Sequence, residues 1–434
     1  MLKALLIAAG RGERLGEITK DRPKPLVDLL GLSLIERIIL TAREVGISDF
    51  VIVIGYKGEK IKEKLGNGEK YGVKIEYVEN REWKKGNALS VMKAKNLFND
   101  KFVLLMSDHI FNRDILSALI KSNIKASVIL AVDRREPLEE DTKVLEEGGL
   151  IKDIGKKIRK ANAIDTGIFM CSPRFFQYVE RAIKEGKDTL SSCVLEAAKN
   201  GDARIFDISK LDNAWWIDID TKEDLREAER ILCRNLIKRT DGPISKYINR
   251  PISVRISKVL AKTSIKPSTI SIISFILCIV SFYLFFIGNY LSIALAGVVG
   301  QISSIIDGCD GEIARLKFMA TDYGAWLDAV LDRYGDAFVI AGIIYASWFS
   351  SEDIKVWLFG LVALIGTFMN SYTAIRYDSL FAESRRKHEI RIGRDVRMFL
   401  IMIGSLLNQL FYTLVALGIL TNAEVIRRIY VCRD

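Results

Sequence analysis

Cysteine and histidine are scarce in this 434-residue sequence, and their arrangement argues against a zinc site. The six cysteines form no CxxC pair and share no regular spacing, so we interpret them as free thiols in a reducing compartment. The two histidines, His109 and His388, have no convincing ligand partners in the sequence and are interpreted as local structure. The short apolar N-terminus is followed at once by charged residues, which favours a buried strand over a signal peptide.

Charge is distributed unevenly along the chain. The formal net charge is +10, but charged residues are concentrated before about Lys266, and long apolar runs lie after it. This separation indicates a soluble half joined to a membrane half. Because the basic residues cluster beside the apolar segments, we expect them to face an anionic membrane surface and phosphate-bearing substrates. We expect no nucleic acid partner.

Residues 1–232 alternate short β-rich runs with helical stretches. This alternation is typical of a mostly parallel sheet with helices on both faces, and it predicts an α/β Rossmann-like domain. The predicted strands are Leu2–Ala8, Phe50–Ile54, Lys74–Val78, Phe102–Met106 and Ser127–Val132. The predicted helices are Ser33–Val45, Gly86–Leu97 and Phe175–Lys184.

A basic segment and several apolar segments follow this domain. Residues 233–266 are rich in Lys and Arg interleaved with Ile and Val, which fits a helix lying in the membrane interface; a plain charged linker is the alternative. Residues 267–434 predict an all-α polytopic membrane domain with about six transmembrane helices, since a span needs roughly 20 apolar residues. The apolar segments are 268–287, 290–306, 323–349, 354–375 and 396–420, the last of which is expected to form two helices. The positive-inside rule places the soluble domain and both candidate active sites in the cytoplasm.

Four aspartates lie on two neighbouring apolar segments. Asp307 and Asp310 are three residues apart, and Asp328 and Asp332 are four apart, so each pair shares one helix face. A carboxylate within a membrane helix costs about 2.5–3.5 kcal/mol, and bound divalent cations would offset the repulsion among four. Hard oxygen ligands favour Mg²⁺ or Mn²⁺, and two such ions about 4 Å apart can clamp a diphosphate.

The run from Asp307 to Asp332 fits the pattern DxxDGxxAR(x8)GxxxDxxxD, so that residues 244–434 resemble the CDP-alcohol phosphotransferase family. The resemblance implies that the four aspartates bind metal and that Asp332 is also the general base. It further implies that the CDP pocket is lined by Gly311, Arg315, Gly324 and Ser268, the last of which stands where the family often has Asn. The alternative is that Arg315 and Arg333 neutralise the aspartates for a purely structural purpose.

Other charged residues flank this motif. Asp336 continues the acidic stripe one turn beyond Asp332 and is interpreted either as a further ligand or as a helix-packing residue. Arg376, Arg391 and Arg394 are expected to hold a phosphate of the acceptor molecule, with positive-inside anchoring as the alternative.

The first predicted strand runs into a glycine-rich turn. Gly10 and Gly12 leave backbone N–H groups able to cradle phosphates, and Arg14 and Lys24 add positive charge for a triphosphate. Together with the Pro-Lys-Pro-Leu run at 23–26, this turn resembles the sugar-nucleotidyltransferase signature.

That second resemblance covers roughly residues 3–230. It implies catalytic roles for Arg14 and Lys24, a loop beside the base at Gly86, and metal ligands at Asp108 and Asp218. The Asp165-Thr166-Gly167 stretch is expected to line the substrate pocket. The alternative is a degenerate domain that binds nucleotide or serves only as an anchor.

A domain that makes a CDP-alcohol beside one that consumes it suggests two consecutive reactions. The fusion resembles a family of archaeal bifunctional enzymes that pair an inositol-1-phosphate cytidylyltransferase with a di-inositol-phosphate phosphate synthase. We therefore expect CTP, inositol 1-phosphate and a CDP-alcohol as substrates, Mg²⁺ or Mn²⁺ as cofactor and, by analogy, a homodimer in the cell membrane. The alternatives are a phospholipid synthase that uses CDP-diacylglycerol or CDP-archaeol with an inactive N-terminal domain, and a non-catalytic membrane anchor or transporter.

Overall fold

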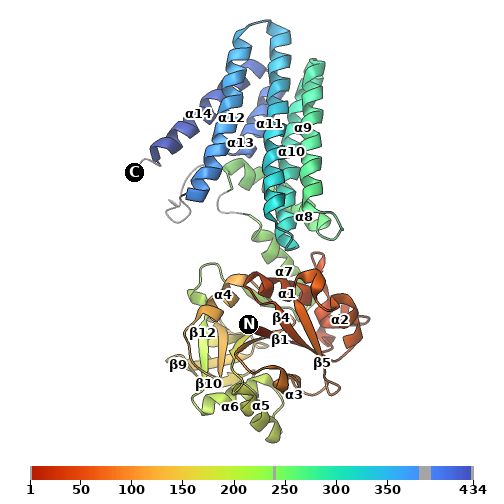
Figure 1. Cartoon of the computed structure of the whole chain (residues 1–434), viewed down its shortest axis with the longest axis vertical. Helices are drawn as coiled ribbons and strands as arrows, with labels where there is room; N and C mark the ends of the chain where they lie inside the picture. The colour runs from red at the N-terminus through yellow and green to blue at the C-terminus, as the bar shows by residue number, and fades with distance from the viewer. Residues whose placement is uncertain (1, 238–240, 381–391, 432–434) are drawn as a thin grey trace. The chain divides into compact units, whose positions relative to one another are not determined.

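The structure is a computed structural model that describes residues 2–237, 241–380 and 392–431 (Figure 1). The chain divides into two compact units, Met1–Arg230 and Ile231–Asp434, and each is described by itself.

The first unit is built on one large sheet. Its strands are β1 (Lys3–Ala8), β4 (Asp49–Ile54), β5 (Lys74–Glu79), β6 (Phe102–Met106), β8 (Val128–Asp133), β9 (Lys143–Glu147), β10 (Leu150–Gly155), β11 (Ala163–Cys171) and β12 (Ala203–Asp207). Within the described part of this unit, these nine strands pair in the order β5-β4-β1-β6-β11-β8-β12-β10-β9. The five predicted strands are confirmed as β1, β4, β5, β6 and β8. The sheet is mixed rather than mostly parallel, because β11 runs antiparallel to both β6 and β8.

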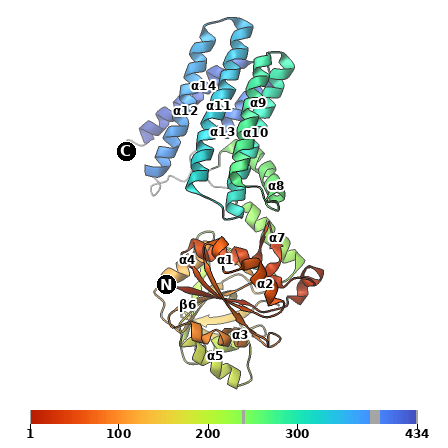
Figure 2. The same cartoon turned by 45° about the vertical axis from the view of Figure 1, so that its right-hand side comes forward.

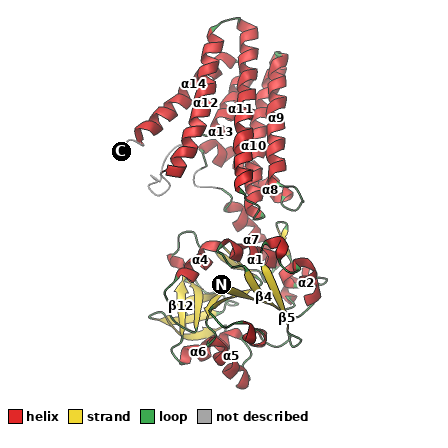
Figure 3. Cartoon of the chain, viewed as in Figure 1, coloured by secondary structure: helices red, strands yellow, loops and turns green. Residues whose placement is uncertain are grey.

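Helices cover both faces of this sheet. They are α1 (Leu34–Glu44), α2 (Gly58–Leu65), α3 (Asn87–Lys93), α4 (Arg113–Lys121), α5 (Phe175–Lys184), α6 (Leu190–Lys199) and α7 (Lys222–Arg234). The helices α5 and α6 lie on one side, with α3 packed against both, and α1 and α4 lie on the other (Figure 3). Helix α1 begins with a capping box between Ser33 and Glu36. The predicted α/β fold is confirmed.

The second unit is helical. A π-helical turn, Ser245–Asn249, leads into α8 (Arg250–Leu260), α9 (Pro267–Ile287), α10 (Tyr290–Leu316), α11 (Asp322–Ser351), α12 (Lys355–Leu380), α13 (Arg394–Leu406) and α14 (Leu410–Val431). Long helices lie side by side in Figure 2, with α10 packed on α9 and α13, and α12 packed on α14. Helix α8 buries Ser253 and Ser257 and exposes Arg255 and Lys258.

Among the described residues, four helices are long and apolar enough to cross a membrane, namely α9, α10, α12 and α14. The protein is therefore a membrane protein. Helix α11, predicted as a span over 323–349, is 30 residues long but does not meet the same test of apolarity. The segment 396–420 does divide into two helices, α13 and α14. The predicted count of about six spans is thus approximate.

Glycines set the close approach of these helices. A Cβ at Gly297 of α10 would lie 2.6 Å from the Cβ of Ser405 on α13, and one at Gly342 of α11 would lie 2.9 Å from Phe285 on α9. Small residues let membrane helices pack with their backbones close together. This packing brings polar residues from α9, α10, α11 and α13 to one region.

Candidate functional site

In the first unit, a short pair of strands assembles a cluster of possible metal ligands. Strand β7 (His109–Phe111) pairs antiparallel with β13 (Trp216–Asp218), which sets His109 opposite Asp218, and Asp108 directly precedes β7. Asp108, His109 and Asp218 each offer one ligand atom, and these atoms lie within 4.8 Å of one another. The two predicted metal ligands are therefore neighbours, and His109, which we interpreted from the sequence as local structure, lies with them.

Lys24 is the central cation of this cluster. Its Nζ lies 2.7 Å from Asp108 Oδ2, 2.6 Å from Asp220 Oδ1 and 3.8 Å from Asp218 Oδ1. Arg14 lies beside it, with Nη1 2.7 Å from Asp220 Oδ2. Asp220 was missed in the sequence, although alternation along an extended segment places it on the same face as Asp218.

The charges and the carboxylate oxygens of this cluster favour the binding of a further cation. Burial by itself would lower the pKa of Lys24, but Asp108, Asp218 and Asp220 outweigh it and raise this pKa above its ordinary value. Burial raises the pKa of Asp218 to about 6, despite His109 nearby. Within the described part of the chain, the buried Oδ1 atoms of Asp108 and Asp218 have no hydrogen-bond partner. Buried carboxylate oxygens left unpaired in this way fit a divalent cation.

The predicted glycines of this site occupy different environments. Gly12 has a φ of +71°, and a Cβ there would lie 2.5 Å from Lys24 Cβ, so glycine lets the lysine approach the turn. A Cβ at Gly10 would have no heavy atom within 4 Å. A Cβ at Gly86 would lie 2.1 Å from the carbonyl oxygen of Asp188, so protein packing already accounts for this glycine. A contact of Gly86 with the nucleotide stays a prediction.

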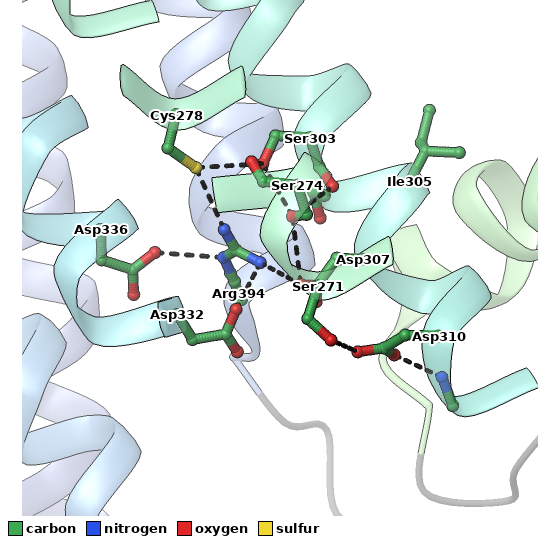
Figure 4. Close-up of polar contacts among 12 residues, drawn as sticks. Ser271, Ser274, Cys278, Ser303, Ile305, Asp307, Asp310, Asp332, Asp336 and Arg394 are labelled. Atoms are coloured by element: carbon green, nitrogen blue, oxygen red, sulfur yellow. Dashed lines mark hydrogen bonds and ion pairs between the residues drawn. The ribbon is translucent and has the colours of Figure 1, made fainter. Parts of the chain in front are cut away.

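In the second unit, α10 and α11 bring together three of the four predicted aspartates, and Figure 4 shows where Asp307, Asp310 and Asp332 lie. Ligand atoms of Asp307, Asp328 and Asp332 lie within 4.8 Å of one another. The carboxylate of Asp310 accepts a hydrogen bond of 2.5 Å from Ser271 Oγ on α9. Ser274, one turn further along α9, donates to Asp307 Oδ1 at 3.2 Å. Ser271 and Ser274 were not predicted, whereas the predicted Ser268 lies at the start of the same helix, half-buried.

Arg394 lies among these carboxylates. It is one of the residues that we predicted to hold the acceptor phosphate. Its Nη1 is 2.8 Å from Asp307 Oδ1 and 2.6 Å from Asp332 Oδ1, and its Nε is 3.3 Å from Asp336 Oδ1. Figure 4 shows the guanidinium between Asp332, Asp336 and Asp307. Arg376 is exposed and lies over the ring of Tyr372. Arg391 and His388 lie outside the described residues.

Two buried polar atoms indicate where a ligand would complete the membrane site. Asp328 Oδ1 and Arg315 Nε are buried and have no hydrogen-bond partner among the residues that the structure describes. Arg315 also donates from Nη2 to the carbonyl of Leu236 at 3.2 Å. Gly324 donates its N–H to Thr321 Oγ1 at 3.0 Å and so belongs to the N-terminal cap of α11. An unpaired carboxylate oxygen and an unpaired guanidinium N–H fit a divalent cation with its phosphate ligand.

A cavity of about 330 Å³ adjoins Asp307 and Asp332. Its wall carries five arginines and a few polar groups, among them Arg250, Arg333, Arg394, Arg397, Arg428, Asn249 and Asn370. Arg250 is fixed by a two-pronged ion pair with Asp241, at 2.9 and 3.0 Å, and by Glu312 at 2.7 Å. Arg250 and Arg428 were not singled out in the sequence as residues of a site. Arg428 could have been found from the sequence, because it is a charged residue within an apolar helix, α14.

Asp336 forms a buried ion pair that holds α11 to α13. It is 1% exposed, and Arg397 Nη2 lies 2.7 Å from its Oδ2, which favours the helix-packing interpretation over a metal ligand. We expect Asp336→Asn to lower the free energy of unfolding by about 3–5 kcal/mol, because it leaves Arg397 buried and unpaired. Denaturant unfolding of the detergent-solubilised protein measures this. Asp322→Asn, at an exposed position in the first turn of the same helix, is the control. Equal stability of the two variants would contradict the assignment.

Comparison with known proteins agrees with this two-part organisation. Residues 3–235 match the nucleotidyl transferase family and residues 264–425 match the CDP-alcohol phosphatidyltransferase family. Both families use divalent cations. Among solved structures, the inositol-1-phosphate CTP transferase from T. maritima is 29% identical, with a TM-score of 0.47, over 53% of this chain and 94% of that chain.

Curated relatives match along nearly the whole sequence. A "Bifunctional IPC transferase and DIPP synthase" from Aquifex aeolicus is 36% identical over 98% of this chain and 97% of its own length. A protein of the same name from Thermococcus kodakarensis is 31% identical over 99% of this chain and 96% of its own length. Since both domains and the full length are shared, the chain belongs to the family of bifunctional IPC transferases and DIPP synthases.

Proposed function

We propose that this enzyme carries out two consecutive reactions. The first unit joins CTP and inositol 1-phosphate to form CDP-inositol and releases pyrophosphate. The second unit transfers phosphoinositol from CDP-inositol to a second inositol 1-phosphate and releases CMP. The observation that carries the proposal is that two separate carboxylate clusters, around Asp108 and around Asp307, occur in one chain whose relatives share its full length.

In the first unit, we assign substrate binding to the cationic side of the cluster. Arg14 and Lys24 would bind the triphosphate beside the Gly10–Gly12 turn, and Asp108 and Asp218 would hold the cation. A phosphate oxygen of inositol 1-phosphate then attacks the α-phosphorus of CTP, and the bond to the β-phosphate breaks to release pyrophosphate. The cation, when bound, supplies charge neutralisation for the leaving pyrophosphate. Lys24 holds its positive charge throughout, because its carboxylate neighbours stabilise the ammonium.

In the second unit, we assign proton transfer to Asp332. Its carboxylate takes the proton from the acceptor hydroxyl, whose oxygen attacks the phosphorus that carries inositol, and the P–O–P bond to CMP breaks. Asp307, Asp310 and Asp328 would hold the divalent cations, which stabilise the charge that develops on the diphosphate. Arg394 contacts Asp332 at 2.6 Å and orients it. We assign the CDP pocket to Gly311, Arg315, Gly324 and Ser268.

The arginine-lined cavity is the place we propose for the acceptor. It borders Asp332, so an acceptor phosphate held by its arginines would present a hydroxyl to the base. Arg333 lines this cavity, and its Nη1 lies 3.6 Å from Asp332 Oδ2, a loose ion pair. We therefore assign the acceptor phosphate to the arginines of the cavity rather than to Arg376. Arg394 belongs both to the predicted residues and to the cavity lining.

Substitution of Arg333 tests this assignment. We expect Arg333→Gln to raise the KM for the acceptor roughly 10- to 100-fold with a smaller change in kcat, because one charge-assisted hydrogen bond to phosphate is lost. The matched control is Arg376→Gln, which removes a guanidinium that is exposed and outside the cavity lining. Steady-state kinetics with varied acceptor distinguish the two. A larger KM effect at Arg376 would restore the assignment made from the sequence.

We further propose the metal ion, the membrane orientation and the oligomeric state of the enzyme. Mg²⁺ or Mn²⁺ is the expected ion in both clusters. We place the N-terminal domain, residues 1–232, on the cytoplasmic side by the positive-inside rule. Within the basic segment 233–266, we place α8 in the membrane interface with Arg255 and Lys258 toward the headgroups. A homodimer is expected from resemblance to the CDP-alcohol phosphotransferases. Protease accessibility in sealed vesicles tests the orientation in the membrane. Light scattering of the solubilised protein tests the homodimer.

The overall proposal is tested by the products. The full chain in detergent is incubated with CTP, inositol 1-phosphate and Mg²⁺, and the mixture is analysed by mass spectrometry. We expect pyrophosphate and CDP-inositol, followed by CMP and a phosphodiester of inositol with inositol 1-phosphate. Chelation of the divalent cation should stop both steps. If CDP-diacylglycerol or CDP-archaeol supports CMP release while CTP and inositol 1-phosphate give no pyrophosphate, the phospholipid-synthase alternative holds instead.

A further inference from the structure

His109 lies against the metal-binding carboxylates of the first unit. Its Nε2 is 3.7 Å from Asp108 Oδ1 and 3.6 Å from Asp218 Oδ2. These distances are too long for hydrogen bonds, which end near 3.2 Å for nitrogen donors. They are close to the separation of roughly 3–3.5 Å between two ligands bound to one cation at about 2.1 Å each. The three atoms therefore surround a common point rather than bonding to one another.

The other ring nitrogen fixes which tautomer faces that point. His109 Nδ1 lies 2.7 Å from the carbonyl oxygen of Thr166. A carbonyl oxygen only accepts hydrogen bonds, so Nδ1 carries the hydrogen and donates it. In the neutral ring, Nε2 is then left with its lone pair directed at Asp108 and Asp218. A histidine that donates one N–H to a backbone carbonyl is the usual arrangement of a metal-ligating histidine.

Two further residues hold the imidazole in this orientation. The ring of Trp216 stacks on it, with centroids 5.8 Å apart and planes 15° from parallel, and Trp216 Nε1 donates to Asp133 at 3.0 Å. Gly167 has a φ of +72°, and a Cβ there would lie 2.4 Å from His109 Nδ1. Glycine at 167 is thus required by both the backbone and the ring. The orientation of the lone pair is built into the fold.

We infer that His109 is a third ligand of the cation in the first unit, completing a set of one nitrogen and two carboxylate oxygens. Such a mixed set shifts preference from Mg²⁺ toward Mn²⁺ and other transition ions, because imidazole is a softer ligand than carboxylate or water. The cluster of Asp307, Asp328 and Asp332 in the second unit offers oxygen ligands alone. The two sites of one chain would therefore differ in their choice of ion.

This inference rests on the proposed function of the first unit. Its test, however, measures metal coordination and not the rate of turnover. The probe is Mn²⁺ alone, added without nucleotide to the full-length protein in detergent. Pulsed EPR detects the ¹⁴N nucleus of an imidazole bound directly to Mn²⁺. The chain has two histidines, so two variants cover every possible source of that signal. His388 is the one histidine in the sequence of the second unit, so in His388→Gln any Mn²⁺ bound at that unit's aspartates gives no imidazole signal.

We expect an imidazole ¹⁴N coupling in the unmodified protein and in His388→Gln, and its loss in His109→Gln. Mn²⁺ affinity of the first-unit site should fall about tenfold or more in His109→Gln, with a smaller change for Mg²⁺. The absence of the coupling from the unmodified protein would overturn the inference whether or not any variant folds. Its persistence in His109→Gln would do the same. Either failure leaves the cytidylyltransferase proposal standing, since that proposal fails only if CTP and inositol 1-phosphate yield no pyrophosphate.

Discussion

Asp332→Asn is expected to lower the rate of CMP release from CDP-inositol and inositol 1-phosphate by about 10²- to 10⁴-fold, the usual contribution of a general base. The amide retains the shape of the side chain but cannot accept the proton. Arg394 keeps its partners at Asp307 and Asp336 in the variant, so its guanidinium is not left buried without a counter-ion. Titration calorimetry with CDP-inositol should show donor affinity within a few fold of the unmodified protein.

The control for this prediction lies on the same helix. Asp322→Asn makes the same chemical change in the first turn of α11, where the side chain is exposed, and should leave CMP release unchanged. If Asp332→Asn retained turnover, Asp332 would have no part in proton transfer. The remaining carboxylates would then need to be tested in its place.

The second large effect is expected at Asp108 and should separate the two reactions. Asp108→Asn should reduce pyrophosphate release from CTP and inositol 1-phosphate by at least about 100-fold, because the carboxylate contacts both Lys24 and the proposed cation. When CDP-inositol is supplied directly, CMP release should proceed at the normal rate. The two activities are measured on one preparation, so a general folding defect would be visible as loss of both.

A matched variant is available in the same unit. Asp114→Asn, on the exposed side of α4, should leave both activities unchanged. Normal pyrophosphate release in Asp108→Asn would remove Asp108 from the metal site. Absence of pyrophosphate release from the unmodified protein would instead support the degenerate-domain alternative for residues 1–232.

Local patterns were sufficient to predict much of the fold. The strand at 102–106 and the helix at 175–184 were predicted with their observed ends, because a buried apolar run and an amphipathic period are both local signals. The membrane aspartates were predicted as metal ligands for a similar reason, since their three- and four-residue spacing on apolar helices is unusual, and the structure brings Asp307, Asp328 and Asp332 together. Strand β11 gave no comparable signal of direction, and its antiparallel insertion between β6 and β8 depends on tertiary contacts.

Residues that join a site from a distant element could not be predicted in this way. His109 and Asp218 meet only because β7 pairs with β13, and no spacing in the sequence reports that pairing. Likewise, too few basic residues lie near the membrane aspartates in sequence to balance them. The structure supplies the balance from α13, where Arg394 and Arg397 reach Asp307, Asp332 and Asp336.

The position of Arg394 also bears on how the enzyme can be handled. With a guanidinium already between Asp307 and Asp332, part of the mutual repulsion of these acids is relieved from within the protein. Helices α10 and α11, which both pack on α9, thus have an internal counter-charge between their aspartates when no ion is bound. Purification in EDTA should give a folded but inactive protein, and dialysis into buffer with magnesium should restore its activity.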